Sequence, residues 1–387
     1  MILHQLNTLN NGIGNIKIDG ERITAVYKDQ KSTSHEDHDH LYFEDSIAFP
    51  GLINSHDHLD FNLFPQLGNY HYKNYLEWGN DIHRENKEVI RQILTIPKAL
   101  RVRWGLYKNL LNGITTVVQH GEKFKLNDAP INIFNQCHSL HSVHLEKNWK
   151  YKLNKPFIPN YPFVIHIGEG TDKGSFDEIN DLLQWNLLKR KLIGIHGVAM
   201  NHEQASQFEA LIWCPDSNYF LLNATAAIDK IKTATKIIFG TDSTVSAGWN
   251  IWRQLREARS TAMLTDQELT EAVFSSPATV WKLKDTGTLK ENYYADMVVA
   301  KKREPANNSV DAFFATNPED IQLILNRGTI IFFDQALLPQ LKNISIKNYS
   351  KLFINNSCKY VIGDLPGLLK EIKKHAPECH FPIEVEA

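Results

Sequence analysis

Residues 50–58 read PGLINSHDH and place two histidines directly after an apolar run. Alternate residues of an extended chain point to the same side, so the imidazoles of His56 and His58 can converge on one metal ion. Two surface histidines at the end of a strand would give the same short pattern. At the carboxyl end of a buried parallel strand, where barrel enzymes keep their sites, metal ligation is the favoured interpretation.

Apolar runs and helical patterns alternate on the C-terminal side of this segment. The runs lack a clean alternation of apolar and polar residues, which is typical of strands buried on both faces of a parallel sheet. The alternation covers residues 50–285, about 236 residues, which is close to the ~250 of a (β/α)8 barrel. We therefore predict an α/β fold in which a TIM-like barrel covers residues 49–285.

Short strands separated by turns are predicted at both ends of the chain, in residues 1–48 and 286–335. A chain that begins and ends in small strands around one α/β block predicts that both ends pair into one small β domain. Residues 336–387 carry little pattern beyond a helical stretch, LPGLLKEIKKH. We treat them as a C-terminal extension.

Charge and cysteine content argue against several classes of protein. The 387 residues include 42 Lys and Arg against 44 Asp and Glu, a net charge of −2, which argues against a protein that mainly holds nucleic acid or acidic membrane. Four scattered cysteines form no CxxC pair, and we find no signal peptide or 18-residue apolar run. We expect a soluble cytoplasmic protein. Its 17 histidines make a metal or proton-transfer site worth seeking.

Three later apolar runs also end on side chains that can bind metal. They are FVIH ending at His166, LIGIH ending at His196, and KIIFGTD ending at Asp242. Each of these residues alone could equally be a hydrogen-bonded group at the end of a strand. Together with His56 and His58 they would form one converging site of nitrogen and oxygen ligands, a type of site that suits zinc or iron.

The motifs resemble the amidohydrolase superfamily, in particular its cytosine deaminase-like and chlorohydrolase branch. The resemblance extends to about residue 335 and depends on PGLINSHDH, IHIGE at 165–169, IHG at 195–197, CPDSN at 214–218, FGTDS at 239–243 and GTLKENYYADMVV at 287–299. It implies a (β/α)8 barrel with a small β-sandwich built from both chain ends. By the same resemblance His56, His58, His166 and Asp242 hold the metal, and His196 polarises bound water or substrate.

Glu169 stands three residues after His166, as in the His-x-x-Glu of the mononuclear deaminase-like members. The resemblance implies that this carboxylate moves protons and does not bind the metal. An activated water needs a base that takes its proton and returns it to a leaving nitrogen, and a carboxylate is suited to that task. The simpler alternative is that Glu169 only begins a surface loop, GEGTDKGS.

A site with two metals would normally need a carboxylated lysine on the fourth strand of the barrel. His166 follows His120 by only 46 positions (166 − 120), and the lysines between them lie in polar, irregular sequence. We therefore predict one divalent metal, with zinc preferred to iron. The short interval leaves little room for two strand-helix units, so we expect the barrel to be distorted around its third and fourth strands.

Three residues are candidates for contact with the substrate. His120 ends the apolar run ITTVVQ and points toward the barrel mouth, although a hydrogen-bonded strand-end histidine is equally consistent. His141 lies with His138 and His144 where the branch often places a substrate-contacting histidine, and the sequence does not decide among the three. Trp249 could wall a pocket for a flat ring or pack in the core.

The expected activity is hydrolysis of a non-peptide carbon–nitrogen bond, with deamination of a nitrogen heterocycle or related amine. The metal lowers the pKa of a water, Glu169 accepts its proton, His196 orients the reactants, and Asp242 doubles as a base. An amidase or dechlorinase-type hydrolase at the same site remains an alternative, as does a catalytically silent barrel that serves as a binding module. The expected partner is a small-molecule substrate, without nucleic acid or membrane, and a homodimer stays open.

Overall fold

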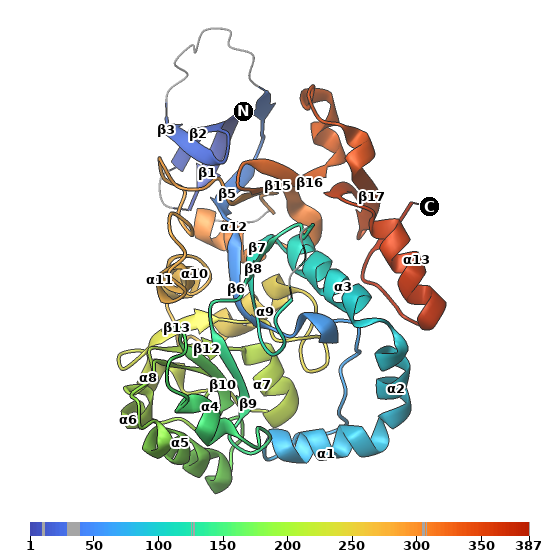
Figure 1. Cartoon of the computed structure of the whole chain (residues 1–387). Coiled ribbons are helices and arrows are strands. Elements are labelled where there is room, and N and C mark those ends of the chain that lie inside the picture. Colours follow the sequence, from blue (N-terminus) through green and yellow to red (C-terminus); the bar gives the residue numbers. More distant parts are fainter. Residues whose placement is uncertain are drawn as a thin grey trace.

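The computed structural model describes residues 1–9, 12–28, 39–124, 126, 128–303, 306 and 308–386. These residues form one sheet of 11 strands and two smaller parallel sheets, with helices packed around the parallel sheets (Figure 1). Among the helices in these ranges, none is long and apolar enough to cross a membrane.

Eight parallel strands form the two smaller sheets. Three form one sheet in the order β6 (Leu52–Asp57), β7 (Ile114–Gln119) and β8 (Asn132–Phe134). Five form a second sheet in the order β13 (Lys236–Phe239), β12 (Ala210–Trp213), β11 (Leu192–His196), β10 (Phe163–Ile167) and β9 (His138–Ser142). Every residue of β6, β7, β10, β11 and β12 is buried. The prediction of an α/β fold with parallel strands covered on both faces is therefore confirmed.

Helices connect these strands in chain order. Between β6 and β7 lie a 3-10 turn η1 (Leu59–Phe61) and the helices α1 (Tyr75–Glu85), α2 (Lys87–Thr95) and α3 (Lys98–Leu111). The later connections contain α4 (Trp149–Leu153), α5 (Lys173–Trp185), α6 (His202–Ala205), α7 (Pro215–Leu222) and α8 (Ile228–Ile231). After β13 come α9 (Ile251–Ser260), α10 (Asp266–Glu271) and α11 (Ser275–Val280).

The 11-stranded sheet takes its strands from both ends of the chain. Its N-terminal strands are β1 (Ile2–Thr8), β2 (Gly12–Asp19), β3 (Arg22–Tyr27), β4 (His40–Tyr42) and β5 (Ser46–Pro50). Its later strands are β14 (Met297–Lys301), β15 (Ile321–Asn326), β16 (Thr329–Asp334), β17 (Tyr349–Ile354), β18 (Ser357–Ile362) and β19 (Glu384–Val385). The order is β19-β17-β18-β16-β15-β14-β5-β1-β2-β3, with β4 paired to β1. In Figure 1 the blue and the orange-to-red strands lie together above the parallel sheets.

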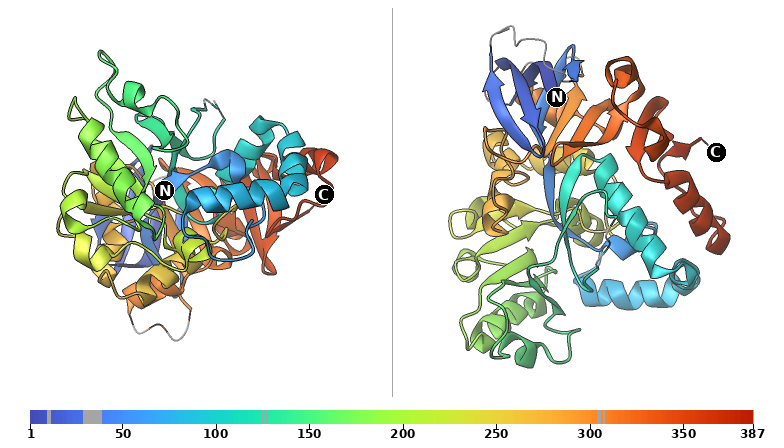
Figure 2. Two further views of the ribbon diagram at one scale, coloured as in Figure 1. Left: turned by 90° about the horizontal axis from the view of Figure 1, so that it is seen from below. Right: turned by 45° about the horizontal axis from the view of Figure 1, so that its top comes forward.

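The segment 336–387 forms more structure than its sequence pattern indicates. Strands β17 and β18 make an antiparallel hairpin in which Asn355 and Asn356 have φ angles of 45° and 65°. Asparagine tolerates this left-handed conformation, so the Asn-Asn pair between two alternating segments is a hairpin signal. The remaining helices of this half are α12 (Ser309–Ala315), α13 (Leu365–His375), η2 (Pro318–Asp320), η3 (Gln335–Gln340) and η4 (Ile346–Asn348). Helix α13 packs beside α3 (Figure 2).

Aromatic packing and one glycine join the 11-stranded sheet to the parallel strands. Phe49 at the end of β5 contacts Trp252 of α9 and Phe313 of α12, with ring centroids 5.5 and 5.1 Å apart. Gly51 follows, and a Cβ there would lie 2.2 Å from the hydroxyl oxygen of Thr115. Only glycine permits this close approach of β6 to β7. The junction fixes where β6, and hence the His56 and His58 pair, leaves the sheet.

The carboxyl ends of β6, β7 and β13 are tied to one another by the backbone. The Asp242 N–H donates to the His56 carbonyl at 3.1 Å, and the His120 N–H donates to the Asp57 carbonyl at 3.0 Å. Side chains that follow these three strands are thereby brought to one place. The sequence pattern anticipates this convergence, because parallel strands present their carboxyl ends at the same edge.

Replacement of Gly105 by alanine is expected to destabilise the protein, because a Cβ on this α3 residue would lie 2.2 Å from the Leu59 carbonyl oxygen in η1. Alanine normally stabilises a helix interior by about 0.5–1 kcal/mol, but here the backbone must shift, at a cost of about 1–3 kcal/mol. Gly79→Ala in α1 is the matched control, since its Cβ would meet nothing within 4 Å. The midpoint of denaturant unfolding should fall for Gly105→Ala only. Equal unfolding midpoints for Gly105→Ala and Gly79→Ala would contradict the close packing of α3 on η1.

Candidate metal centre

Three predicted ligands from two strands come together. His56 is the fifth residue of β6, His58 follows β6 directly, and His166 lies in β10. One ring nitrogen of each lies within 4.8 Å of the other two, and the Nε2 atoms of His58 and His166 are 3.3 Å apart. The extended backbone of β6 directs both of its imidazoles to the same side, as the alternation of a strand requires.

A second group overlaps the first through His56. His196 at the end of β11 and Asp242 after β13 each place one ligand atom within 4.8 Å of the other and of His56. The Oδ1 atom of Asp242 is 3.5 Å from Nε2 of His56, and its Oδ2 is 4.0 Å from Nε2 of His196. His196 and Asp242 have φ angles of 71° and 57°. Non-glycine residues rarely adopt this conformation, and its strain is concentrated at functional sites.

The donor set fits a divalent metal ion. His56 is fully buried, and neither of its ring nitrogens has a hydrogen-bond partner among the described residues. Burial lowers the pKa of His58 and of His196 to about 3 and that of His166 well below its usual value. These imidazoles are therefore neutral, which is the form that binds a metal. Three imidazoles and a carboxylate are ligands that zinc accepts.

Asp242 is held as a carboxylate by short hydrogen bonds. Its Oδ2 accepts from the hydroxyls of Ser217 and Ser246, both at 2.9 Å, and its Oδ1 accepts from the Ser243 N–H at 2.7 Å. Burial alone would raise the pKa of this carboxyl, but the nearby His56, His196 and His58 together outweigh burial, and the pKa lies well below its usual value. Ser217 and Ser246 were not among the predicted residues, although each lies near a quoted motif, CPDSN and FGTDS.

Glu169 lies beside His196 and is not in a surface loop. The Oε1 atom of Glu169 is 3.5 Å from Nε2 of His196, and the side chain is buried. Burial raises the pKa of Glu169 well above its usual value, and the charges of Asp242 and Glu178 add to the effect. Its backbone carbonyl accepts a hydrogen bond from the Tyr75 N–H at 3.1 Å, so the start of α1 fixes its loop. The raised pKa favours the protonated form of this carboxyl.

His196 is oriented by a residue that sequence reasoning missed. The Nδ2 atom of Asn218 in α7 lies 2.8 Å from Nδ1 of His196, and Thr225 donates to the amide oxygen of Asn218 at 3.2 Å. With the Asn218 amide as donor, the proton of the neutral imidazole is on Nε2. That atom faces Glu169 and Asp242. Asn218 closes the CPDSN motif, which supplied the resemblance but no role for this residue.

A buried lysine contacts groups at the carboxyl ends of two strands. Lys108 of α3 is 1% exposed, and its Nζ contacts the Asp57 carboxylate at 3.1 Å, the Thr241 hydroxyl at 3.1 Å and the Asp242 carbonyl at 3.2 Å. Asp57 also accepts from Asn109 at 2.7 Å. The sequence signal was a lysine inside the mostly apolar helical stretch RWGLYKNLL. Its partners come from two distant segments, so the pattern alone could not place them.

The cavity at the centre has a volume of about 310 Å³ and is lined by His58, His166, His196, Glu169 and Asp242. Of the predicted substrate contacts, His141 also lines this cavity. His138 instead lies 2.9 Å from the Pro159 carbonyl, and His144 lies 3.4 Å from Glu178.

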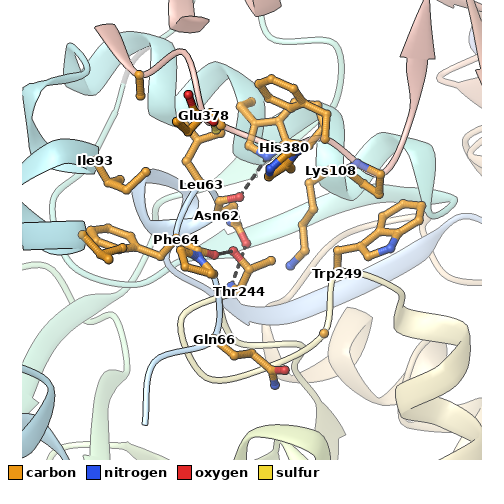
Figure 3. A pocket seen from close by; sticks show the side chains of 18 of the residues that line it. Asn62, Leu63, Phe64, Gln66, Ile93, Lys108, Thr244, Trp249, Glu378 and His380 are labelled. Carbon is orange, nitrogen blue, oxygen red and sulfur yellow. Dashed lines mark hydrogen bonds between the residues drawn. The ribbon is translucent and has the colours of Figure 1, made fainter. Parts of the chain in front are cut away.

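The other two predicted substrate contacts are not among the residues that line this cavity. His120 is buried against His166, with ring centroids 4.6 Å apart, and neither of its ring nitrogens has a partner among the described residues. Trp249 lines a separate cavity of about 510 Å³. Figure 3 shows Trp249 and Lys108 in that second cavity, together with Glu378 and His380 of the C-terminal segment.

Lys108→Met is expected to lower the free energy of unfolding by about 3–5 kcal/mol, because it leaves the Asp57 carboxylate buried without its cation. Adding Asp57→Asn should recover part of this loss, since a neutral amide needs no counter-charge. Lys173→Met removes the solvent-exposed ion pair with Asp177 and is the control, with no measurable change expected. Denaturant unfolding of the four chains measures the effect. A Lys108→Met chain as stable as the control would contradict the role of this ion pair.

The sequence matches no family model and no curated protein. Its structure is similar to atrazine chlorohydrolase from Arthrobacter aurescens complexed with zinc, with a TM-score of 0.60 and 17% identity over 85% of this chain and 94% of that one. An adenosine deaminase from Xanthomonas campestris with bound zinc gives 0.69 and 12% identity over 98% of both chains. Helicobacter pylori aminofutalosine deaminase in complex with methylthio-coformycin gives 0.61 and 14% identity over 85% of this chain and 99% of that one.

These structures cover at least 85% of the chain at low sequence identity, so the likeness concerns the fold. It agrees with the resemblance of the motifs at 50–58, 165–169 and 239–243, because a chlorohydrolase and two deaminases were the kinds of protein that resemblance pointed to. The chain thus has the fold of the atrazine chlorohydrolase and deaminase structures.

Proposed function

We propose that the protein is a metal-dependent hydrolase of a non-peptide carbon–nitrogen bond, which deaminates a nitrogen heterocycle or a related amine. The observation that carries the proposal is the position of Glu169, a buried carboxyl with a raised pKa, 3.5 Å from His196 in the cavity that the metal-binding side chains line. The similar structures support it, since two are named as deaminases and one as a chlorohydrolase. By this proposal the chain is a member of the amidohydrolase superfamily.

The proposed architecture is a (β/α)8 barrel made of β6 to β13. Three strands and five strands add to eight, and the bond from the Asp242 N–H to the His56 carbonyl supports closure between β13 and β6. Strands β8 and β9 follow each other in the chain but lie in different sheets. We assign the expected distortion around the third and fourth strands to this gap. The small β domain would comprise the 11-stranded sheet, including β17 to β19.

His56, His58, His166 and Asp242 would hold one divalent metal, with zinc preferred to iron. A bound zinc ion acts as a Lewis acid and lowers the pKa of a water ligand to about 7. Zinc in two of the similar structures supports this assignment.

The residues of the chain would move the protons of the reaction. Glu169 accepts the proton of the attacking water and then donates it to the leaving nitrogen, and its raised pKa favours that donation. His196 carries its proton on Nε2 and hydrogen-bonds the group under attack. Asp242 accepts the proton of the new hydroxyl as ammonia leaves. Ser217 and Ser246 hold the Asp242 carboxylate in place throughout.

Glu169→Gln should keep its metal and lose turnover by a factor of about 10² to 10⁴, because the amide cannot carry the proton. Ammonia release from a panel of aminated purines, pyrimidines, pterins and triazines gives the rate, and elemental analysis gives the metal content. Glu371→Gln on the exposed face of α13 is the control and should be unaffected. A fully active Glu169→Gln chain would contradict the assignment of Glu169 as the residue that carries the proton. With chlorinated triazines added to the panel, chloride release without ammonia would favour the dechlorinase alternative.

Metal content tests the ligand assignment separately. The purified or reconstituted chain should bind about one transition metal ion, as a structural or catalytic zinc site does, and His166→Ala should bind much less. His202→Ala, which alters an exposed histidine of α6, is the control. Inductively coupled plasma mass spectrometry counts the ions. A wild-type chain that stays well below one ion after reconstitution would instead favour a silent binding module.

A further inference from the structure

The cavity at the metal centre draws its polar and its apolar lining from different segments. Most of the polar lining residues follow the strands β6, β10, β11 and β13, as described above, while His141 lies in β9 and Tyr75 and His83 lie in α1. The apolar lining comes mainly from α1, α2 and the segment after β6, and includes Phe64, Leu67, Trp78, Ile82 and Ile90. A substrate with its reacting carbon at the metal centre therefore extends its remaining part against an apolar wall.

Apart from the imidazole of the exposed His83, the polar side-chain groups on this wall are already engaged. Trp78 Nε1 donates to the Leu67 carbonyl at 2.7 Å, and the Tyr75 hydroxyl donates to Oε2 of Glu178 at 3.2 Å. A polar substituent placed there would lose its hydration without gaining a partner, which costs about 1–3 kcal/mol. The wall therefore disfavours hydroxyl or amide groups on the substrate and favours alkyl groups.

The lining also lacks the permanently cationic side chains that usually bind an anion. Among the described residues that line this cavity, none is lysine or arginine, and the carboxyl groups are those of Glu169 and Asp242. Phosphate and carboxylate groups of substrates are normally bound by such cations, in bidentate form by arginine. A buried anion without a counter-charge is strongly disfavoured. Nucleotides and carboxylated heterocycles therefore do not match this cavity.

Apolar side chains continue to the cavity mouth. Phe61, Leu94 and Leu145 line the cavity and are nevertheless 37%, 51% and 53% exposed. Leucine and phenylalanine side chains gathered at a rim are typical of a surface that contacts an apolar ligand. The volume of about 310 Å³ is at the small end of ligand pockets.

We propose that the substrate is a small uncharged heterocyclic amine that carries an apolar substituent, and that this substituent packs on α1 and α2. The proposal rests on the hydrolase function proposed above and adds the chemical class of its substrate. The segment 59–95 between β6 and α3 then determines specificity, while the strand ends determine the reaction.

Binding of three matched compounds to the zinc-loaded full chain tests the proposal. They are diaminotriazine, its propyl derivative and its carboxyethyl derivative, of which the last two share a three-carbon chain and differ by the two carboxylate oxygens. Calorimetry should show the propyl compound binding about tenfold tighter than the parent, because its carbons are buried. The carboxyethyl compound should bind more weakly than the parent. Equal affinities, a preference for the carboxyethyl compound, or no binding of any of the three would overturn the proposal.

A cation at the cavity mouth should change this order of affinities. Leu94→Lys places an ammonium at the rim, so the advantage of the propyl compound should shrink and the carboxyethyl compound should bind better than it does to the wild type. Leu188→Lys is the control, since Leu188 is 48% exposed but does not line the cavity. If Leu94→Lys left the order of affinities unchanged, this would contradict the proposed contact between the substituent and the side chains at the cavity mouth.

Ammonia release, measured in the same samples, separates this proposal from the proposed reaction. Preferred binding of the propyl compound without ammonia release would support the substrate class and count against deamination of this ring. Ammonia release with a preference for the carboxyethyl compound would support deamination and overturn the substrate class.

Discussion

The site depends on the hydrogen bonds that hold the carboxyl end of β6 against that of β13. The Asp242 N–H reaches the His56 carbonyl, and Lys108 spans the Asp57 carboxylate and the Asp242 carbonyl from the opposite side. A lysine that is 1% exposed is stable only when its charge is matched and its three protons have acceptors. Asp57, Thr241 and Asp242 supply these acceptors, so a shift of either strand end would leave a buried charge unsatisfied.

This constraint explains how several imidazoles can share one buried place. Two charged histidines at such separations would repel each other, but burial lowers the pKa of His58, His166 and His196 so that all three are neutral. Ring nitrogens without hydrogen-bond partners are still costly to bury, as for His56. Metal binding would give these ring nitrogens a partner and remove that cost. The same contact would then stabilise the buried histidines and serve their function. The left-handed backbone at His196 and Asp242 persists because neighbouring hydrogen bonds hold it.

The sequence predicts the position of a side chain where a single strand determines it. It does not predict contacts between side chains of different elements. The alternation in residues 50–58 and the apolar runs before His166, His196 and Asp242 were enough to predict parallel strands and the grouping of these side chains. Lys108 and Asn218 act on groups more than 20 positions away, so no local spacing reveals them. The sequence also did not show which cavity Trp249 lines, because the loop after Asp242 places this side chain at another cavity. Its contact with the substrate stays a prediction. The C-terminal strands were not predicted, because their alternation of apolar and polar residues is weak and the Asn-Asn turn between them was not recognised.

Chemistry and specificity occupy separate parts of the chain. The groups that would perform hydrolysis follow β6, β10, β11 and β13, and the hydrogen-bond network of Lys108 and Asp57 restricts any movement there. Helices α1 and α2 contact the cavity with apolar side chains and meet the centre mainly through the bond from the Tyr75 N–H to Glu169. Substitutions on these helices change the shape of the cavity without breaking the network behind the ligands. On the proposals above, the same strand ends could serve different substrates, since the ligands would set the reaction class and the segment 59–95 would select the substrate.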